Sequence, residues 1–195
     1  MALQSPYFTT PRRGRENLSG CSYFFVTTTV VNFTNIFIAP ELCDILIKVI
    51  KYYQEKYKFE ILSYVIMPSH FHWIIEINPK TGTISDIMRD IKKYSAWEIL
   101  DIIEKKNPEM VRIFTEASKK YPGQKRKLWM SRFHDEVIRD EKMFWTKLNY
   151  IHNNPVEAGL AKRIEDYIYS SAANYKSGNH SVLQINIGLA GINIV

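Results

Sequence analysis

Two histidines one residue apart, His70 and His72, stand inside the hydrophobic stretch YVIMPSHFHWIIEI, residues 64–77. Its β-branched and aromatic residues favour a strand. Alternate side chains of a strand share one face, so both imidazoles are expected on the same side of a sheet. Two imidazoles on one face can hold one divalent ion, although such histidines are at least as often ordinary packed residues. Ligand type alone would allow Zn²⁺ or Mn²⁺ equally.

A second pair of polar groups, Tyr150 and Asn154, lies in the stretch FWTKLNYIHNNP. We predict a helix over residues 139–154 with an apolar stripe that includes Phe144. Tyr150 lies about 120° from Phe144 around such a helix, so it does not belong to the stripe. Asn154 follows four residues later and therefore stands beside the phenol. The alternative interpretations are an amphipathic surface tyrosine and a helix-capping asparagine.

The elements that position these groups follow from hydrophobic periodicity and turn residues. Pro155 is expected to end the third helix, because helical geometry is disfavoured before proline. Strands are expected over residues 21–33, 58–67 and 70–77 and around 133–138, and helices over 39–57, 84–100 and 139–154. The order of strand, helix, strand, strand, helix, strand and helix is that of the ferredoxin-like split βαβ fold with one more helix.

We therefore predict an α+β fold with an antiparallel four-stranded sheet and helices on one face, plus an extra C-terminal helix that carries Tyr150. The other face, with the histidine pair, is expected to stay free. Residues 1–20 are expected to form a flexible basic arm, residues 21–175 the folded domain and residues 176–195 a C-terminal tail. Residues 101–127 are rich in charge, are expected to be partly helical and indicate no chemistry.

Composition limits the class of protein. The chain has 195 residues, of which 46% are hydrophobic and 24% charged, which is typical of a soluble globular domain. The two cysteines, Cys21 and Cys43, have no partner at metal-ligand spacing, and this favours a reducing compartment. No apolar run approaches the ~20 residues that a membrane helix needs. We expect a cytoplasmic protein that does not bind a membrane.

The chain is moderately basic, with a formal net charge of +6 and a sequence pI of about 9.2. Such a charge suits an anionic partner such as nucleic acid. Much of it comes in short clusters, for each of which a solvated helix face is the alternative interpretation. The clustered residues that could meet such an anion are Arg12, Arg13, Arg15, Lys92, Lys93, Lys125, Arg126 and Lys127.

Two motifs together resemble a known family. The stretch YVIMPSHFHWII, residues 64–75, followed by YIHNNPVEAGL, residues 150–160, is similar to the Y1 transposases, the IS200/IS605-type single-tyrosine enzymes with an HUH motif. It is most similar to their REP-associated branch. Phe71 fits the bulky hydrophobic residue between the two histidines. The resemblance covers about residues 20–175.

The resemblance implies a ferredoxin-like sheet and a role for each candidate residue. His70 and His72 would be ligands of Mg²⁺ or Mn²⁺, and Asn154 would complete the metal site. Tyr150 would attack a phosphodiester of single-stranded DNA and form a 5′-phosphotyrosine. The implied substrate is a single strand that folds into a hairpin, bound by a monomer or a homodimer.

Under this interpretation the basic clusters would hold phosphates, and an exposed aromatic such as Tyr94 could stack on unpaired bases. Trp97 is a second candidate for stacking, although core packing is its expected role. The alternative function is a catalytically silent module of ferredoxin-like fold that binds single-stranded nucleic acid. A pure binder has no reason to keep both histidines, the tyrosine and the asparagine, so the enzyme is the preferred hypothesis.

Overall fold

The computed structural model of the chain describes residues 22–178 and 182–188. The strands are β1 (Ser22–Thr29), β2 (Glu60–Met67), β3 (His70–Ile77) and β4 (His134–Val137). The α-helices are α1 (Pro40–Tyr57), α2 (Ile84–Lys106), α3 (Pro108–Ser118), α4 (Glu141–Glu157) and α5 (Ala172–Ser177). Two short 3-10 helices are η1 (Val31–Phe33) and η2 (Ile164–Asp166). The predicted arm of residues 1–20 lies outside the described residues.

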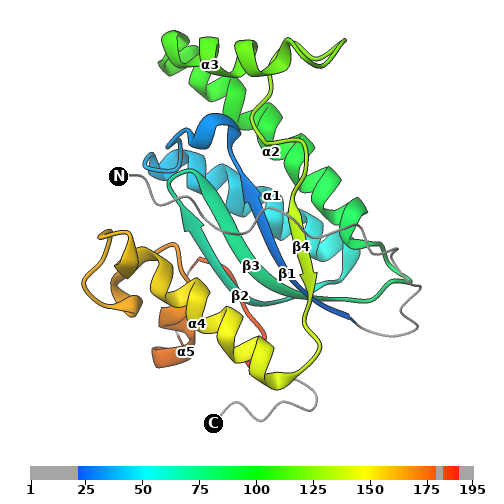
Figure 1. The fold of residues 1–195 in the computed structure, drawn as a ribbon, viewed down its shortest axis with the longest axis vertical. Coiled ribbons are helices and arrows are strands. Elements are labelled where there is room, and N and C mark those ends of the chain that lie inside the picture. Colours follow the sequence, from blue (N-terminus) through cyan, green and yellow to red (C-terminus); the bar gives the residue numbers. More distant parts are fainter. Residues whose placement is uncertain (1–21, 179–181, 189–195) are drawn as a thin grey trace.

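The four strands form one antiparallel sheet in the order β2-β3-β1-β4 (Figure 1). Consecutive strands β2 and β3 pair as a hairpin, and β1 lies between β3 and β4. This is the strand order of the split βαβ fold, so the predicted fold class is confirmed. The pairing register places His72 opposite Thr27, and Thr27 in turn opposite His134.

Helices α1 and α2 pack on one face of the sheet, and α4 packs on the other (Figure 1). The alternation of β1 shows the two layers: Phe24 belongs to the core under α1 and α2, and Phe25 belongs to the core under α4. The expectation that this second face stays free is therefore wrong. Leu62 and Ile74 are apolar residues on that face, and the buried ring of Phe144 on α4 shields them from water.

The charged region of residues 101–127 is partly helical, as predicted. α2 continues to Lys106, beyond the predicted end at residue 100, and α3 begins at Pro108 after a short break. Asn107 closes one helix and caps the next, since its side chain accepts a hydrogen bond from the backbone N–H of Met110. Trp97 is 65% exposed on α2, so its predicted core position is wrong; Ile99 on the same helix is fully buried instead.

The helix that carries Tyr150 does not end before Pro155, as predicted, but continues to Glu157. Pro155 lacks an N–H, which removes one intrahelical hydrogen bond. The loss falls in the last turn, where the backbone N–H of Ala158 still donates to the carbonyl of Asn154 at 3.0 Å. Pro155 is also buried, so its packing offsets the missing bond.

The segment after α4 covers the outer edge of β2. The N–H of Ile66 donates to the carbonyl of Tyr169, and the N–H of Ser171 donates to the carbonyl of Tyr64, each at 2.9 Å. An exposed strand edge would offer these groups to another chain, so the segment protects the sheet. Within residues 22–178 and 182–188, none of the helices is long and apolar enough to cross a membrane.

Candidate active site

The two histidines lie at the start of β3, next to the turn that connects it to β2. Pro68 and Ser69 make the tight turn from β2, and His70 begins the next strand. Its ring centroid lies 4.7 Å from that of His72, with the ring planes at 75°. Both side chains lie on the face of the sheet that α4 partly covers. The prediction that the two imidazoles share one face is confirmed.

Each imidazole has a hydroxyl partner at Nδ1. Thr27 Oγ1 lies 2.7 Å from Nδ1 of His72, and Ser69 Oγ lies 3.1 Å from Nδ1 of His70. A hydroxyl that accepts a hydrogen bond from Nδ1–H leaves the lone pair of Nε2 available. This arrangement, in which an outer partner fixes the tautomer, is the one found around metal-binding histidines.

Burial keeps both histidines uncharged. It lowers the pKa of His70 to about 4. The pKa of His72 is lowered well below its usual range, first by burial and then by electrostatic interaction with His70, Lys147 and His134, which disfavours a charge on His72. A histidine must be neutral to bind a metal, and both residues are neutral at pH 7.

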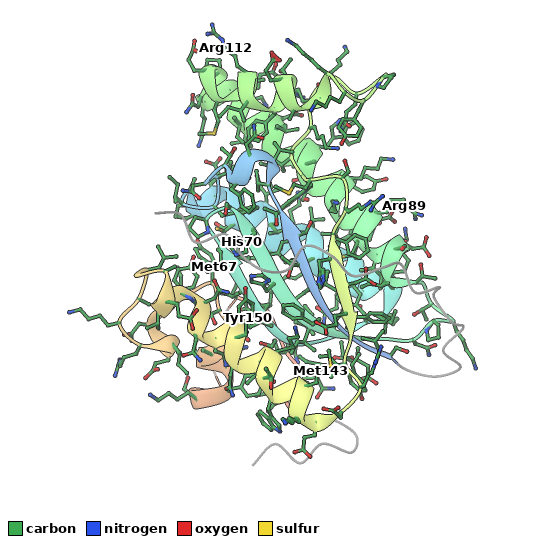
Figure 2. The ribbon with its side chains drawn as sticks, in the orientation of Figure 1. Met67, His70, Arg89, Arg112, Met143 and Tyr150 are labelled. Carbon is green, nitrogen blue, oxygen red and sulfur yellow. The ribbon has the colours of Figure 1, made fainter. Side chains whose placement is uncertain are left out.

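Tyr150 faces this pair from α4. Its Oη lies 3.4 Å from Nε2 of His72, and the two ring centroids are 5.1 Å apart. The edge of the ring packs against Phe25 at a centroid distance of 6.0 Å. Even so, 44% of the tyrosine is exposed, so the residue is not enclosed in the core. Figure 2 shows the two elements that bring His70 and Tyr150 to the same side of the sheet.

Asn154 stands one helical turn beyond Tyr150 and is partly buried. Its carboxamide makes no hydrogen bond to the residues that the structure describes, and so it is available to a ligand. The same part of the chain holds no group of three or more His, Cys, Asp or Glu side chains arranged for a metal. The donor set of two neutral imidazoles and one carboxamide oxygen nevertheless fits a divalent ion.

Sequence reasoning missed two residues of this site. Thr27 contacts His72 across a strand pair that joins residues far apart in the chain, so only the pairing register reveals it. Lys147 stands one turn before Tyr150, with its ammonium 4.6 Å above the ring of Phe25 and 2.7 Å from a carboxylate oxygen of Glu136. The sequence does contain a signal for Lys147: it lies three residues before Tyr150, and residues three apart share a helix face.

His152, between Tyr150 and Asn154 in the sequence, points away from the site. Its Nε2 lies 2.9 Å from Ser171 Oγ and 3.3 Å from Ser63 Oγ. The imidazole is buried, and this burial lowers its pKa to about 4. The three side chains join α4, β2 and the segment before α5, and so they hold the helix of Tyr150 in place.

The predicted DNA contacts lie in different settings. Arg12, Arg13 and Arg15 fall outside the described residues. Lys93 and Lys125 are exposed, and no ion pair joins either of them to another described residue. These two side chains are free to meet a phosphate.

The other three predicted contacts have partners within the protein. Arg126 pairs with Asp101 at 2.9 Å and with Glu104 at 2.8 Å. Lys92 donates to the carbonyl of Met130 at 2.8 Å, and Lys127 donates to Ser131 Oγ at 2.7 Å. The charge of Arg126 is therefore already balanced, whereas the two lysines are bound to neutral groups.

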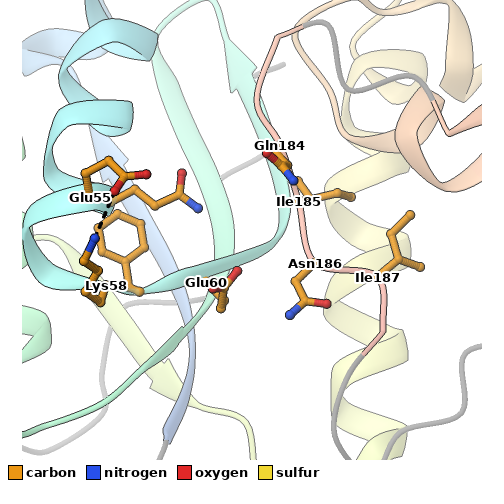
Figure 3. A pocket seen from close by; sticks show the side chains of 9 residues that line it. Glu55, Lys58, Glu60, Gln184, Ile185, Asn186 and Ile187 are labelled. Carbon is orange, nitrogen blue, oxygen red and sulfur yellow. Dashed lines mark hydrogen bonds and ion pairs between the residues drawn. The ribbon is translucent and has the colours of Figure 1, made fainter.

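One hollow of the described surface lies away from these residues. A cavity of about 620 Å³ lies between the end of α1, the start of β2 and residues 184–187 (Figure 3). Its charged lining consists of Glu55, Lys58 and Glu60, and the first two form an ion pair. The start of β2 is opposite the end of β3, far along the hairpin from His70. This cavity is not part of the histidine–tyrosine site.

The comparisons with a family model, with curated proteins and with solved structures agree with one another. The family model described as "Transposase IS200 like" matches residues 17–154. A REP-associated tyrosine transposase of Escherichia coli strain K12 is 29% identical over 113 residues, which are 58% of this chain and 54% of that protein. A protein of Haemophilus influenzae, provisionally named a REP-associated tyrosine transposase, is 27% identical over 117 residues, or 60% of this chain and 61% of that protein. The match thus spans somewhat more than half the length of each relative.

A solved structure has the same fold. It is described as a REP-associated tyrosine transposase bound to a REP hairpin, and it superimposes with a TM-score of 0.63 at 21% identity. The comparison covers 93% of this chain and 96% of the other. The shared sheet and helices agree with the fold predicted from the order of elements.

Proposed function

Because this chain belongs to the IS200-like transposase family, we propose that it is an enzyme that cuts single-stranded DNA and transfers the cut strand. Tyr150 is the nucleophile in this proposal. The observation that carries it is the 3.4 Å between Tyr150 Oη and His72 Nε2, which puts a phenol beside a neutral imidazole pair. A buried core tyrosine would serve packing alone, but this one is 44% exposed.

His70, His72 and Asn154 would hold a divalent ion, Mg²⁺ or Mn²⁺. When bound, such an ion polarises the phosphoryl oxygens of the scissile group and offsets the negative charge that develops there. Thr27 and Ser69 support this role, since their hydroxyls orient the two imidazoles through Nδ1.

The protein's own step is a displacement at phosphorus. Tyr150 Oη forms a bond to the scissile phosphorus while the bond from phosphorus to the 3′ oxygen breaks. The phenol gives up its proton to water on its exposed side, and the leaving 3′ oxygen takes one up as a hydroxyl. The product is a 5′-phosphotyrosine. A second 3′ hydroxyl reverses the step and joins the strand elsewhere, so no further energy source is required.

We propose a single strand that folds into a hairpin as the substrate. The similar solved structure is described as bound to a REP hairpin, and the net charge of +6 suits a polyanion. One copy of the chain carries both histidines, the tyrosine and the asparagine, so a monomer suffices for cleavage, although a homodimer is compatible with the same geometry.

The test is an assay for a covalent adduct. The protein is incubated with labelled hairpin-bearing single strands from the DNA that flanks its gene, with Mg²⁺ or Mn²⁺, and run on a denaturing gel. A metal-dependent shifted band supports the proposal. Binding of these strands without any adduct in either metal would favour the alternative function, a catalytically silent binding module.

A further inference from the structure

Two lysines, Lys92 and Lys127, meet beside the sheet, near the end of β1. Lys92 on α2 donates to the backbone carbonyls of Met130 at 2.8 Å and Ser131 at 3.3 Å. Lys127 donates to Ser131 Oγ at 2.7 Å, and its ammonium lies 3.3 Å from the ring centroid of Tyr121. Ser131 thus joins two cations that come from different parts of the chain.

The positive charge of this pair is not balanced within the part of the chain that the structure describes. Lys127 is only 8% exposed, yet neither it nor Lys92 forms an ion pair there. Burial, and after it the charge of Lys127, lowers the pKa of Lys92 to about 8. Buried charges are normally paired, because desolvation is costly. An anion bound next to the pair would relieve both the desolvation and the repulsion.

A hollow for such an anion adjoins Lys127. A cavity of about 240 Å³ is lined by Asn32, Lys120, Tyr121, Lys127 and Ser131, with the carboxylate of Glu116 at one side. Glu116 pairs with Lys119, so its charge is compensated. The lining offers an ammonium from each lysine, hydroxyls and an amide, which are the groups that bind phosphate oxygens.

The cavity lies close to the histidine pair. Thr29 on β1 is opposite His70 on β3, and on its other side the backbone N–H of Met130 donates to the carbonyl of Thr29 at 2.8 Å. Met130 and His70 are therefore two strand spacings apart, or about 10 Å. Met130 also lines the cavity, so the cavity begins within about this distance of the backbone of His70.

A neighbouring aromatic favours nucleic acid over a free anion. Phe33 follows Asn32 of the cavity lining and is 62% exposed. Phe33 and Asn32 have a positive φ, 52° and 55°, which is uncommon for a phenylalanine, whereas asparagine adopts it more readily. Such conformations are kept where the surroundings or the function require them, and an exposed ring can stack on an unpaired base.

From these observations we propose that Lys127, Lys120 and Ser131, supported by Lys92, form a second DNA site that binds a backbone phosphate of the strand whose scissile group lies at Tyr150. The inference rests on the proposed function for the identity of its ligand. It concerns binding rather than chemistry, so the two can fail separately.

The experiment measures binding in the Tyr150→Phe background, where no covalent adduct interferes. Affinity for a hairpin-bearing single strand is measured over a range of salt concentrations, with Lys127→Met and Lys120→Gln introduced separately. Lys127→Met keeps the aliphatic stem that packs in the interior. Lys120 is exposed, so its replacement is expected to change the stability little. Lys80→Gln, at the far end of β3, is the control for the loss of one surface charge.

Each lysine variant is expected to bind more weakly and to reduce the slope of log Kd against log salt concentration by about 0.7, the value for one phosphate contact on a single strand. Lys80→Gln is expected to keep the slope. Folded Lys127→Met and Lys120→Gln proteins with the unaltered slope would overturn the proposal. Loss of adduct formation in the parent protein together with these slope changes would overturn the cleavage mechanism and leave the second site standing.

A set of oligonucleotides with one neutral methylphosphonate linkage each then locates the contact. The parent protein is expected to lose affinity at one linkage, and Lys127→Met is expected to lose none there, since the cation is already gone. Equal losses in both proteins at every position would contradict the proposal. Inorganic phosphate alone serves as a further arm: if it binds at millimolar concentration to protein with Lys127 but not to Lys127→Met, while both proteins bind the strand equally, the site takes a free anion rather than DNA, which also contradicts the proposal.

Discussion

The hydroxyl of Thr27 lies 2.7 Å from Nδ1 of His72, across the pairing of β1 with β3. The ring of His72 is buried, and its Nε2 lies 3.4 Å from Tyr150 Oη. We propose that Thr27 accepts this hydrogen bond, which would keep the proton on Nδ1 of His72 and leave the lone pair of Nε2 toward Tyr150.

Replacing Thr27 by Val removes this hydroxyl while keeping the shape and the strand preference of the side chain. We expect the affinity for Mn²⁺ to fall about 10-fold to 100-fold, the usual effect of losing an outer partner of a histidine ligand. Thr27→Ser, which keeps the hydroxyl, is the matched control. Isothermal titration with Mn²⁺ measures both, and equal affinities for Thr27→Val and the parent protein would show that this contact does not matter for the metal.

Replacing both His70 and His72 by Ala is expected to remove metal-dependent cleavage altogether, because no other described residues offer two imidazoles on one face. DNA binding measured in the absence of metal is expected to persist, since phosphate contacts supply most of it. The readout is adduct formation against Mn²⁺ concentration. Cleavage that continues with the same metal dependence would mean that the ion binds elsewhere.

Asn154→Ala is expected to weaken metal binding and to raise the Mn²⁺ concentration needed for half-maximal cleavage at least 10-fold. The neighbouring Asn153→Ala is a closely matched control, because it removes the same amide one position away; Asn153 is exposed and donates to the carbonyl of Asn149 within the helix. Both variants are titrated side by side. If they respond to Mn²⁺ alike, the carboxamide of Asn154 is not a ligand.

His152 gives a prediction on pH and stability. Its pKa in the folded protein is lowered from 6.5 to about 4 by burial, so the unfolded chain takes up the proton first as the pH falls. The stability is fully present above pH 6.5, falls as the pH is lowered toward 4, and by linkage the loss reaches at most about 3 kcal/mol.

His152→Gln keeps a hydrogen-bonding group near Ser63 and Ser171 but cannot be protonated. It is expected to lose less stability than the parent protein between pH 6.5 and 4, as measured by urea unfolding. His70, whose pKa is also about 4, contributes the same trend in both proteins and cancels in the comparison. Identical pH profiles for the two proteins would refute the assignment of a neutral buried imidazole at this position.

The sequence predicts most of what is local in this molecule. The alternation of side chains in a strand predicts that His70 and His72 share one face of the sheet. The spacing of four residues in a helix predicts that Tyr150 and Asn154 share one face of α4. The order of elements gives the sheet. None of these inferences requires knowledge of which elements touch.

Contacts between distant segments escape such reasoning. Thr27 and His134 are neighbours only because β1 and β4 pair in this register. Helix α4 covers the second face of the sheet, where it buries Leu62 and Ile74. Pro155 was predicted to end α4 from a local rule, but tertiary packing outweighs the single hydrogen bond it removes. Trp97 is likewise an outward-facing residue that no composition rule distinguishes from a core one.

The identity of the nucleophile is the point on which the mechanism depends, and peptide mapping of the covalent adduct tests it. The chain has 12 tyrosines, but trypsin is expected to cut after Lys147 and Lys162 and so release residues 148–162 with Tyr150 as its one tyrosine. After nuclease treatment of the adduct, mass spectrometry is expected to find a 5′-nucleotide remnant on this peptide, and Tyr150→Phe protein is expected to yield none. A remnant on a peptide that contains any other tyrosine, or an adduct that survives in Tyr150→Phe, would contradict the proposed mechanism.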